Sequence, residues 1–172
     1  MKLIVLKETG FDEALLGLSL NKKQDVTGMP RIAKILSSKD GGHNKFLESI
    51  IVWIDMSAPR GFWQQFDTYR IGVTKQSEST MHTILKHEIT QNNFQIPIYE
   101  PTLTRLNQLR EKKEFHQLKN ELPEGYLQRR IITTNYKTLR NIIQQRKTHR
   151  LKEWQVFCGI VDQLEYADYL GL

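Results

Sequence analysis

The chain has 172 residues, 39% of them hydrophobic and 26% charged, a composition typical of one globular domain over residues 1–172. No run of roughly 18 apolar residues occurs, and the apolar stretch after Lys2 is too short for a signal peptide, so we expect a cytoplasmic protein outside the membrane. The formal net charge of +6 indicates an anionic partner. The lone Cys158 cannot form an internal disulfide and has no Cys or His at metal-ligand spacing around it, so we expect no metal site.

The first third of the chain predicts strands and helices in alternation. Residues 1–7 contain a short apolar run typical of a strand, and residues 11–20 predict a short helix. Pro30 begins a second helix with apolar residues three and four apart. Residues 50–56 are β-branched and aromatic on successive positions, which predicts a strand covered on both faces.

The middle of the chain predicts a short buried helix and a polar loop. The string Ser57-Ala58-Pro59 combines a typical N-cap residue with a proline suited to the first turn. We therefore expect a helix from there to Arg70, with Gly72 ending it. Residues 73–82 are polar and rich in hydroxyl groups, which indicates a loop, and residues 85–98 fit helix and strand equally.

The last third of the chain predicts three helices. Residues 103–118 are amphipathic, and residues 122–125 form a turn. A helix from Thr134 or Asn135 to His149 has two plausible caps, and a last helix runs from Lys152 to about Leu170.

A strongly basic segment overlaps this region. From Tyr126 to Lys152 there are eight Lys or Arg residues and no Asp or Glu. Such a segment suits the phosphate of a nucleotide or of a nucleic-acid backbone. The alternative is a solvated helix face whose charge is balanced by acidic residues elsewhere in the fold.

Arg146 is the most informative basic residue, because it falls within the apolar stripe of its predicted helix. On a helix it projects about 20° from Leu139. A charge on that side needs a partner, and a guanidinium suits a carboxylate, a phosphate or a uracil edge. The alternative is that the long aliphatic stem of Arg146 carries its charged group to solvent at the edge of the fold.

Two blocks of sequence carry a family resemblance. The first is G-H-N-K-F-L-E-S-I-I-V-W-I-D-M-S-A-P from Gly42 to Pro59, continued by Gln65 and Arg70. The second block consists of Leu122-Pro123, Thr133, Asn135, Leu139, Asn141, Arg146 and Trp154. In order and spacing, with one extra residue before Trp154, these blocks resemble the flavin-dependent thymidylate synthases (ThyX), which couple a reduced flavin to methylation of dUMP.

The signature loop of that family is rewritten in this chain. The family pattern R-H-R-x-x-S-x-N-E-x-S-x-R-Y corresponds to T-Y-R-I-G-V-T-K-Q-S-E-S-T-M-H from Thr68 to His82. Two extra loop residues would place Glu78, Thr80 and His82 at the family's Glu, Ser and second Arg. An ungapped alignment would instead put Glu78 where the Ser belongs, which argues against ordinary dUMP methylation.

The resemblance implies an α+β fold with a twisted, largely antiparallel sheet flanked by helices, assembled as a homotetramer with shared sites. It also implies FAD as cofactor, with NADPH and methylenetetrahydrofolate as co-substrates. The implied catalytic residues are Arg146, Thr80 and Glu78. The implied substrate-binding residues are Gln65, Arg70, His82, Lys119 and Arg146. The implied cofactor-binding residues are His43, Lys45, Lys137 and Asn141.

Three functions follow from these observations. The first is a ThyX-like enzyme acting on a pyrimidine nucleotide. The second is a nucleotide-binding protein on the same scaffold that has lost synthesis and sequesters or modifies another nucleotide. Rewritten loops on this scaffold are associated with small phage-encoded relatives of the family. The third, a basic nucleic-acid-binding domain, is disfavoured because only two aromatic residues lie in the basic segment for base stacking.

Overall fold

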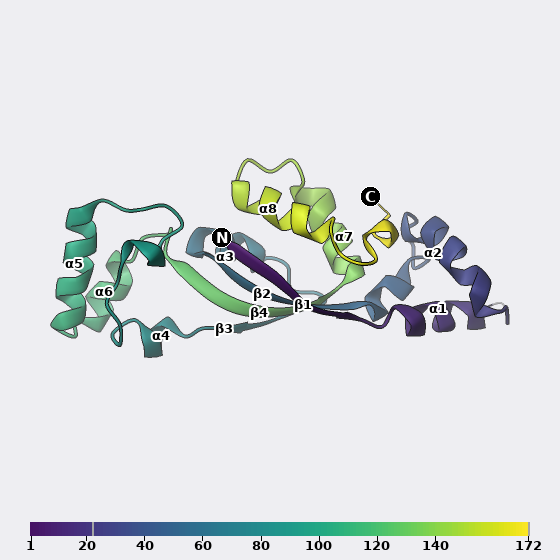
Figure 1. Cartoon of the computed structure of the whole chain (residues 1–172), viewed down its shortest axis with the longest axis horizontal. Coiled ribbons are helices and arrows are strands. Elements are labelled where there is room, and N and C mark those ends of the chain that lie inside the picture. The colour runs from purple at the N-terminus through teal and green to yellow at the C-terminus, as the bar shows by residue number, and fades with distance from the viewer. Residues whose placement is uncertain (22, 172) are drawn as a thin grey trace. The chain divides into compact units, whose positions relative to one another are not determined.

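The computed structural model describes residues 1–21 and 23–171, and Figure 1 shows its helices and strands. Four strands form one antiparallel sheet in the order β1-β2-β4-β3, which confirms the predicted α+β class. The strands are β1 (Lys2–Thr9), β2 (Ile51–Pro59), β3 (Val73–Ser77) and β4 (Leu127–Asn135).

Helices occupy much of the remaining chain. Among the described residues, none of them has both the length and the apolar character needed to span a bilayer. The α-helices are α1 (Phe11–Leu20), α2 (Met29–Ser37), α3 (Arg60–Phe66), α4 (Thr80–Thr83), α5 (Glu100–Glu111), α6 (Phe115–Glu121), α7 (Tyr136–Arg146) and α8 (Lys152–Val161). The short 3-10 helices are η1 (Val26–Gly28), η2 (Lys45–Ser49), η3 (Gln91–Asn93) and η4 (Ala167–Tyr169).

The chain divides into two compact units, and each has its own core. Unit 1 consists of Met1–Lys2, Met56–Thr68 and Gln76–Ile131. Unit 2 consists of Leu3–Asp55, Tyr69–Lys75 and Ile132–Leu172.

In unit 1, helices α5 and α6 pack around an apolar cluster. The two helices are separate because Lys112 ends α5 and Lys113 adopts a positive φ of 59° that a continuing helix does not allow. The prediction of one helix over residues 103–118 was therefore wrong at this break. The buried members of the cluster are Ile84, Ile89, Phe94, Leu106, Leu109, Leu118, Leu122 and Tyr126.

In unit 2, helix α7 lies between η2 and α8. The Asn135 side chain caps α7 by accepting a hydrogen bond from the backbone N–H of Thr138 at 2.9 Å, so the helix starts at one of the two predicted caps. Its apolar stripe of Leu139, Ile142 and Ile143 is buried as the spacing predicted. Helix α8 ends at Val161, earlier than predicted.

Strand β2 continues further than the sequence predicted. Ser57, Ala58 and Pro59 end this strand, so Ser57 is not the N-cap of the next helix. The alternation of buried residues continues through Ala58, and the extended Pro59 backbone leads into α3. Helix α3 then ends at Phe66, four residues before the predicted end at Arg70.

The segment 73–82 is ordered as strand β3 followed by the short helix α4, so the predicted loop was wrong. The backbone beyond β3 remains paired with β4, since the N–H of Glu78 donates to the carbonyl of Arg129 at 2.9 Å. Strand β4 itself went unpredicted, because its buried positions Ile132 and Thr134 include a polar residue and follow Arg129 and Arg130, so the sequence shows no apolar alternation.

Candidate functional site

Arg146 ends helix α7, and its guanidinium lies among aromatic side chains of unit 2. Its Nε donates a hydrogen bond to the hydroxyl of Tyr69 at 2.7 Å. The guanidinium carbon lies 4.9 Å from the ring centroid of Trp154 and 5.5 Å from that of Tyr69. At these distances an aromatic face attracts a cation.

The terminal edge of this guanidinium is unused within the described residues. No carboxylate among residues 1–21 and 23–171 forms an ion pair with Arg146, and its terminal nitrogens donate to no protein acceptor there. The side chain is half-buried, which leaves these nitrogens accessible. The alternative of an internal carboxylate partner therefore has no support, and the terminal edge can bind an acceptor from outside the chain.

The nearby residues Arg70 and Asn141 are both exposed. Asn141 accepts a hydrogen bond from Nε2 of Gln145 at 3.0 Å, and Gln145 in turn contacts the Tyr69 hydroxyl. Asn141 therefore joins the hydrogen-bonded group around Tyr69.

Unit 2 also contains a cavity of about 1110 Å³ formed by α1, α2 and the segment 39–49. His43 and Lys45, both implied cofactor residues, line it. Lys137 contacts the same wall, because its Nζ forms an ion pair at 2.6 Å with Glu48, which also lines the cavity. Apolar side chains of α1 and α2 also line it, together with Lys39, Glu13 and Glu48, which gives the cavity an apolar body and a rim of mixed charge.

An unsatisfied polar atom lies beside this rim. Asn44 stands between His43 and Lys45 and is 2% exposed, yet its side-chain oxygen has no hydrogen-bond donor among the described residues. Gly41 and Gly42 both have positive φ and face open space. The two glycines therefore leave space beside His43, whereas the Asn44 oxygen is buried next to it.

Unit 1 brings together Thr80, an implied catalytic residue, and Lys119, an implied substrate-binding residue. Lys119 Nζ donates to the buried Thr80 hydroxyl at 2.5 Å. Burial, and then the positive charge of Arg60, lower the pKa of Lys119. Arg60 itself donates to the carbonyl of Leu122 at 2.7 Å. Two cations and a hydroxyl therefore lie near one another without a carboxylate partner among the described residues, an arrangement suited to phosphate.

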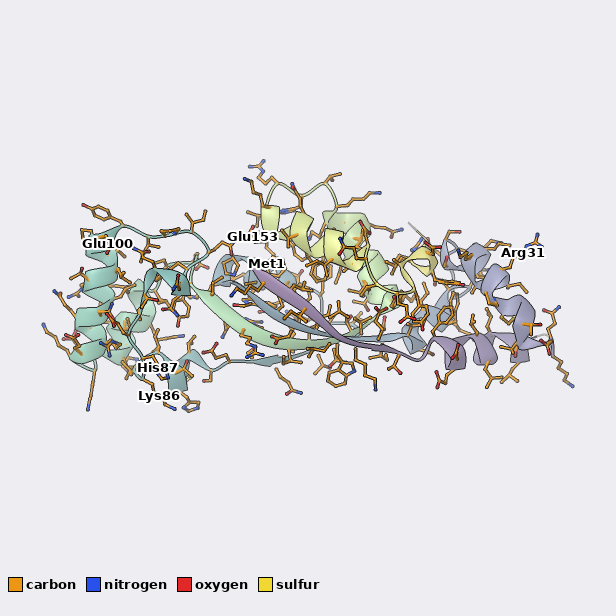
Figure 2. All side chains as sticks on the ribbon, viewed as in Figure 1. Met1, Arg31, Lys86, His87, Glu100 and Glu153 are labelled. Atoms are coloured by element: carbon orange, nitrogen blue, oxygen red, sulfur yellow. The ribbon has the colours of Figure 1, made fainter. Side chains whose placement is uncertain are left out.

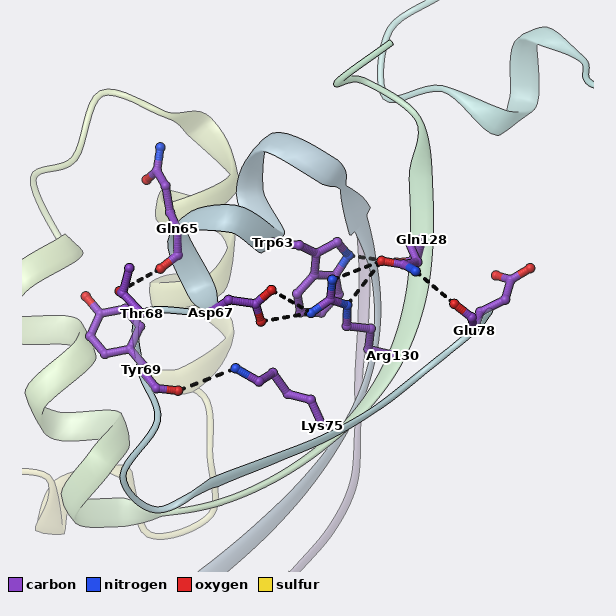
Figure 3. Close-up of polar contacts among 9 residues, drawn as sticks. All are labelled: Trp63, Gln65, Asp67, Thr68, Tyr69, Lys75, Glu78, Gln128 and Arg130. Atoms are coloured by element: carbon purple, nitrogen blue, oxygen red, sulfur yellow. Dashed lines mark hydrogen bonds and ion pairs between the residues drawn. The ribbon is translucent and has the colours of Figure 1, made fainter. Parts of the chain in front are cut away.

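The other implied catalytic and substrate-binding residues of unit 1 are more exposed. Glu78 and His82 are exposed, and Gln65 is half-buried with its carbonyl accepting from the Thr68 hydroxyl at 2.8 Å. The Glu78 carboxylate lies in solvent, while its backbone is held at both ends. Its carbonyl accepts from Nε2 of Gln128 at 2.8 Å, as Figure 3 shows.

A network around Arg130 orients that Gln128 amide. The Arg130 guanidinium carbon lies 4.3 Å from the ring centroid of Trp63, and its nitrogens reach Asp67 at 2.9 Å and the Gln128 side-chain oxygen at 2.9 Å (Figure 3). Trp63 Nε1 donates to the Gln128 carbonyl at 2.9 Å. No sequence pattern predicted this network, because only the fold brings its members together.

Much of the basic segment therefore has internal partners. Arg130 pairs with Asp67, and Lys137 pairs with Glu48. Arg140 is buried and contacts Asp40 at 3.3 Å. This supports the alternative in which acidic residues elsewhere balance the segment.

Among the described residues, no group of three His, Cys, Asp or Glu side chains could hold a metal ion. His87 lies on an exposed bend after α4, and Figure 2 shows it projecting outward beside Lys86. Cys158 is buried, and burial followed by the charge of Asp162 raises its pKa, so its thiol is not activated as a nucleophile.

Comparison with solved structures identifies the fold. The chain is similar to flavin-dependent thymidylate synthase ThyX from Helicobacter pylori complexed with FAD and dUMP, with a TM-score of 0.80 and 20% identity over 99% of this chain and 97% of that one. A second structure of the Helicobacter pylori enzyme with FAD and dUMP gives a TM-score of 0.81 and 19% identity over the same shares. No protein-family model and no curated protein matches the sequence.

The chain is thus an α+β protein with the fold of the flavin-dependent thymidylate synthases. The fold that the two sequence blocks implied is confirmed.

Proposed function

We propose that this chain binds a pyrimidine deoxynucleotide and FAD, and acts as a ThyX-like enzyme that methylates dUMP at C5. The observation that supports this most is Arg146, whose terminal nitrogens have no described protein acceptor although the rest of its guanidinium is held in place. Buried or half-buried cations are normally paired, so an open one indicates a ligand.

Each unit, taken by itself, offers groups that suit one part of a nucleotide. Terminal N–H groups of Arg146 suit a carbonyl oxygen of the pyrimidine, where they stabilise negative charge that builds on the ring during reaction. Within unit 1, Lys119 and Thr80, with the charge of Arg60 nearby, suit a phosphate group.

The cavity of unit 2 fits the cofactor by its chemistry. Its apolar body suits a flat ring system, and His43 and Lys45 suit phosphate groups. When bound, FAD supplies redox chemistry that makes a cysteine nucleophile unnecessary. The inert thiol of Cys158 agrees with such a route.

The cellular partners follow from this proposal. NADPH and methylenetetrahydrofolate would be co-substrates, and a homotetramer would supply sites shared between subunits. We expect a cytoplasmic protein whose anionic partner is a nucleotide. Nucleic acid is a poorer partner, because several cations of the basic segment are paired internally.

Three measurements on the purified protein test the proposal. Protein denaturation should release FAD, a dUMP titration should saturate, and dTMP should form when NADPH and methylenetetrahydrofolate are supplied. Saturable dUMP binding without dTMP would select the second function, a nucleotide-binding protein that has lost synthesis. Binding to long DNA with steep salt dependence, and none to dUMP, would refute both.

A further inference from the structure

Tyr69 is a buried tyrosine whose hydroxyl lies in the middle of a series of hydrogen bonds in unit 2. It is 8% exposed. Its hydroxyl accepts a hydrogen bond from Arg146 Nε at 2.7 Å and contacts Oε1 of Gln145 at 3.1 Å, where it is the donor. The hydroxyl therefore uses its proton on Gln145 and presents a lone pair to Arg146.

This arrangement determines which edge of the guanidinium remains open. A guanidinium can bind two acceptor atoms side by side, either through Nε and one terminal nitrogen or through its two terminal nitrogens. Because Nε of Arg146 already donates to Tyr69, the first edge is occupied. Only the edge formed by the two terminal nitrogens is left for a ligand.

Trp154 and Tyr69 restrict different motions of this group. The guanidinium lies over the Trp154 ring, which limits tilting away from that face. The Tyr69 hydroxyl limits rotation, since turning the guanidinium would break the bond to Nε. The two rings are themselves packed edge to face, with centroids 5.9 Å apart and an interplanar angle of 76°.

We propose that Tyr69 is a positioning residue that commits Arg146 to binding its ligand through the two terminal nitrogens. The ligand is the acceptor oxygen of a pyrimidine nucleotide, so this inference rests on the proposed function. Tyr69 does not touch the nucleotide. It acts by keeping the guanidinium in one orientation before the ligand arrives, which reduces the entropy lost on binding.

A double-mutant cycle on dUMP affinity tests this role. Tyr69→Phe keeps the ring and removes the hydroxyl, and we expect it to raise the dUMP Kd about tenfold, equivalent to ~1.4 kcal/mol. In an Arg146→Met background the same change should alter the Kd by less than about twofold, because coupled residues are not additive. A merely structural role for the hydroxyl would weaken binding equally in both backgrounds.

Tyr169→Phe is a matched control. Tyr169 also lies beneath a cation, with Lys34 Nζ 5.5 Å from its ring centroid, and it lies outside the hydrogen-bonded group around Arg146. We expect this variant to bind dUMP like the wild type. Urea unfolding of each variant shows whether a change in Kd comes from loss of folded protein.

Hydrogen exchange of the Arg146 Nε–H, followed by NMR, tests the geometry without a nucleotide. The Nε–H should be protected in the wild type and exchange faster in Tyr69→Phe. Unchanged exchange would overturn the inference, as would a wild-type Kd in Tyr69→Phe or equal losses in both backgrounds. A wild type that binds no dUMP but shows the exchange difference would refute the proposed function while leaving the Tyr69 contact established.

Discussion

Replacing Arg146 by Met separates a ligand-binding role from a structural one. Met keeps much of the apolar stem and removes the charge. The losses are one hydrogen bond to Tyr69, about 1 kcal/mol, and the attraction to Trp154, about 0.5–2 kcal/mol. Avoided desolvation of the charge offsets part of this, so we expect the free energy of unfolding to fall by about 1–2 kcal/mol.

Arg130→Met is the matched comparison. Arg130 also lies over a tryptophan, but its variant would in addition lose the ion pair with Asp67 and two hydrogen bonds to Gln128. We expect that variant to lose about 3 kcal/mol. Urea denaturation of both variants measures the difference.

A dUMP titration then decides the role of Arg146. We expect Arg146→Met to raise the Kd at least about tenfold, or ~1.4 kcal/mol, for the loss of a charge-assisted contact. A variant that loses 3 kcal/mol or more in stability, yet binds dUMP like the wild type, would show that Arg146 serves the fold alone.

Three further predictions use other parts of the chain. Burial and Arg60 lower the pKa of Lys119 below 10.5, so between its folded and unfolded pKa values the unfolded chain binds more protons and the free energy of unfolding should rise with pH. The dUMP affinity should fall over the same pH range, because the lysine loses its charge. Lys119→Arg should abolish this fall in affinity, and a fall that persists would exclude Lys119 as its cause. Gly72→Ala should lower the free energy of unfolding by at least about 2 kcal/mol in thermal or urea unfolding, because φ is +69° and a Cβ would lie 2.3 Å from the Thr138 hydroxyl. Gly159→Ala, at a helix position where a Cβ meets no other atom, should be neutral or stabilising. Light scattering should give the mass of a homotetramer, and a monomer at micromolar concentration would contradict shared sites.

The sequence predicted the fold where local pattern and tertiary context agree. Strand β1, helix α1 and the capped start of α7 were predicted because apolar spacing and capping chemistry indicate the same structure at each. Strand β3 and helix α4 were missed because a polar edge segment has no apolar signature, and its order depends on backbone pairing with β4.

The candidate site was predictable only one residue at a time. Arg146 could be singled out because a charge interrupted an apolar stripe. Its partners could not, since Tyr69 is 77 residues away and both Tyr69 and Trp154 are ordinary as core aromatics. The role of Arg60 was also hidden, because its proximity to Lys119 arises only from folding.

Helix α7 has a consequence for redesign. Lys137 and Arg146 are nine residues apart, which on a helix means about 13.5 Å along the axis and about half a turn around it. Under the proposed function, the two cations would therefore contact different parts of the bound molecules. Substitutions at either end should therefore combine additively in binding, whereas inserting one residue between them would turn one end by about 100° and disturb both sites together.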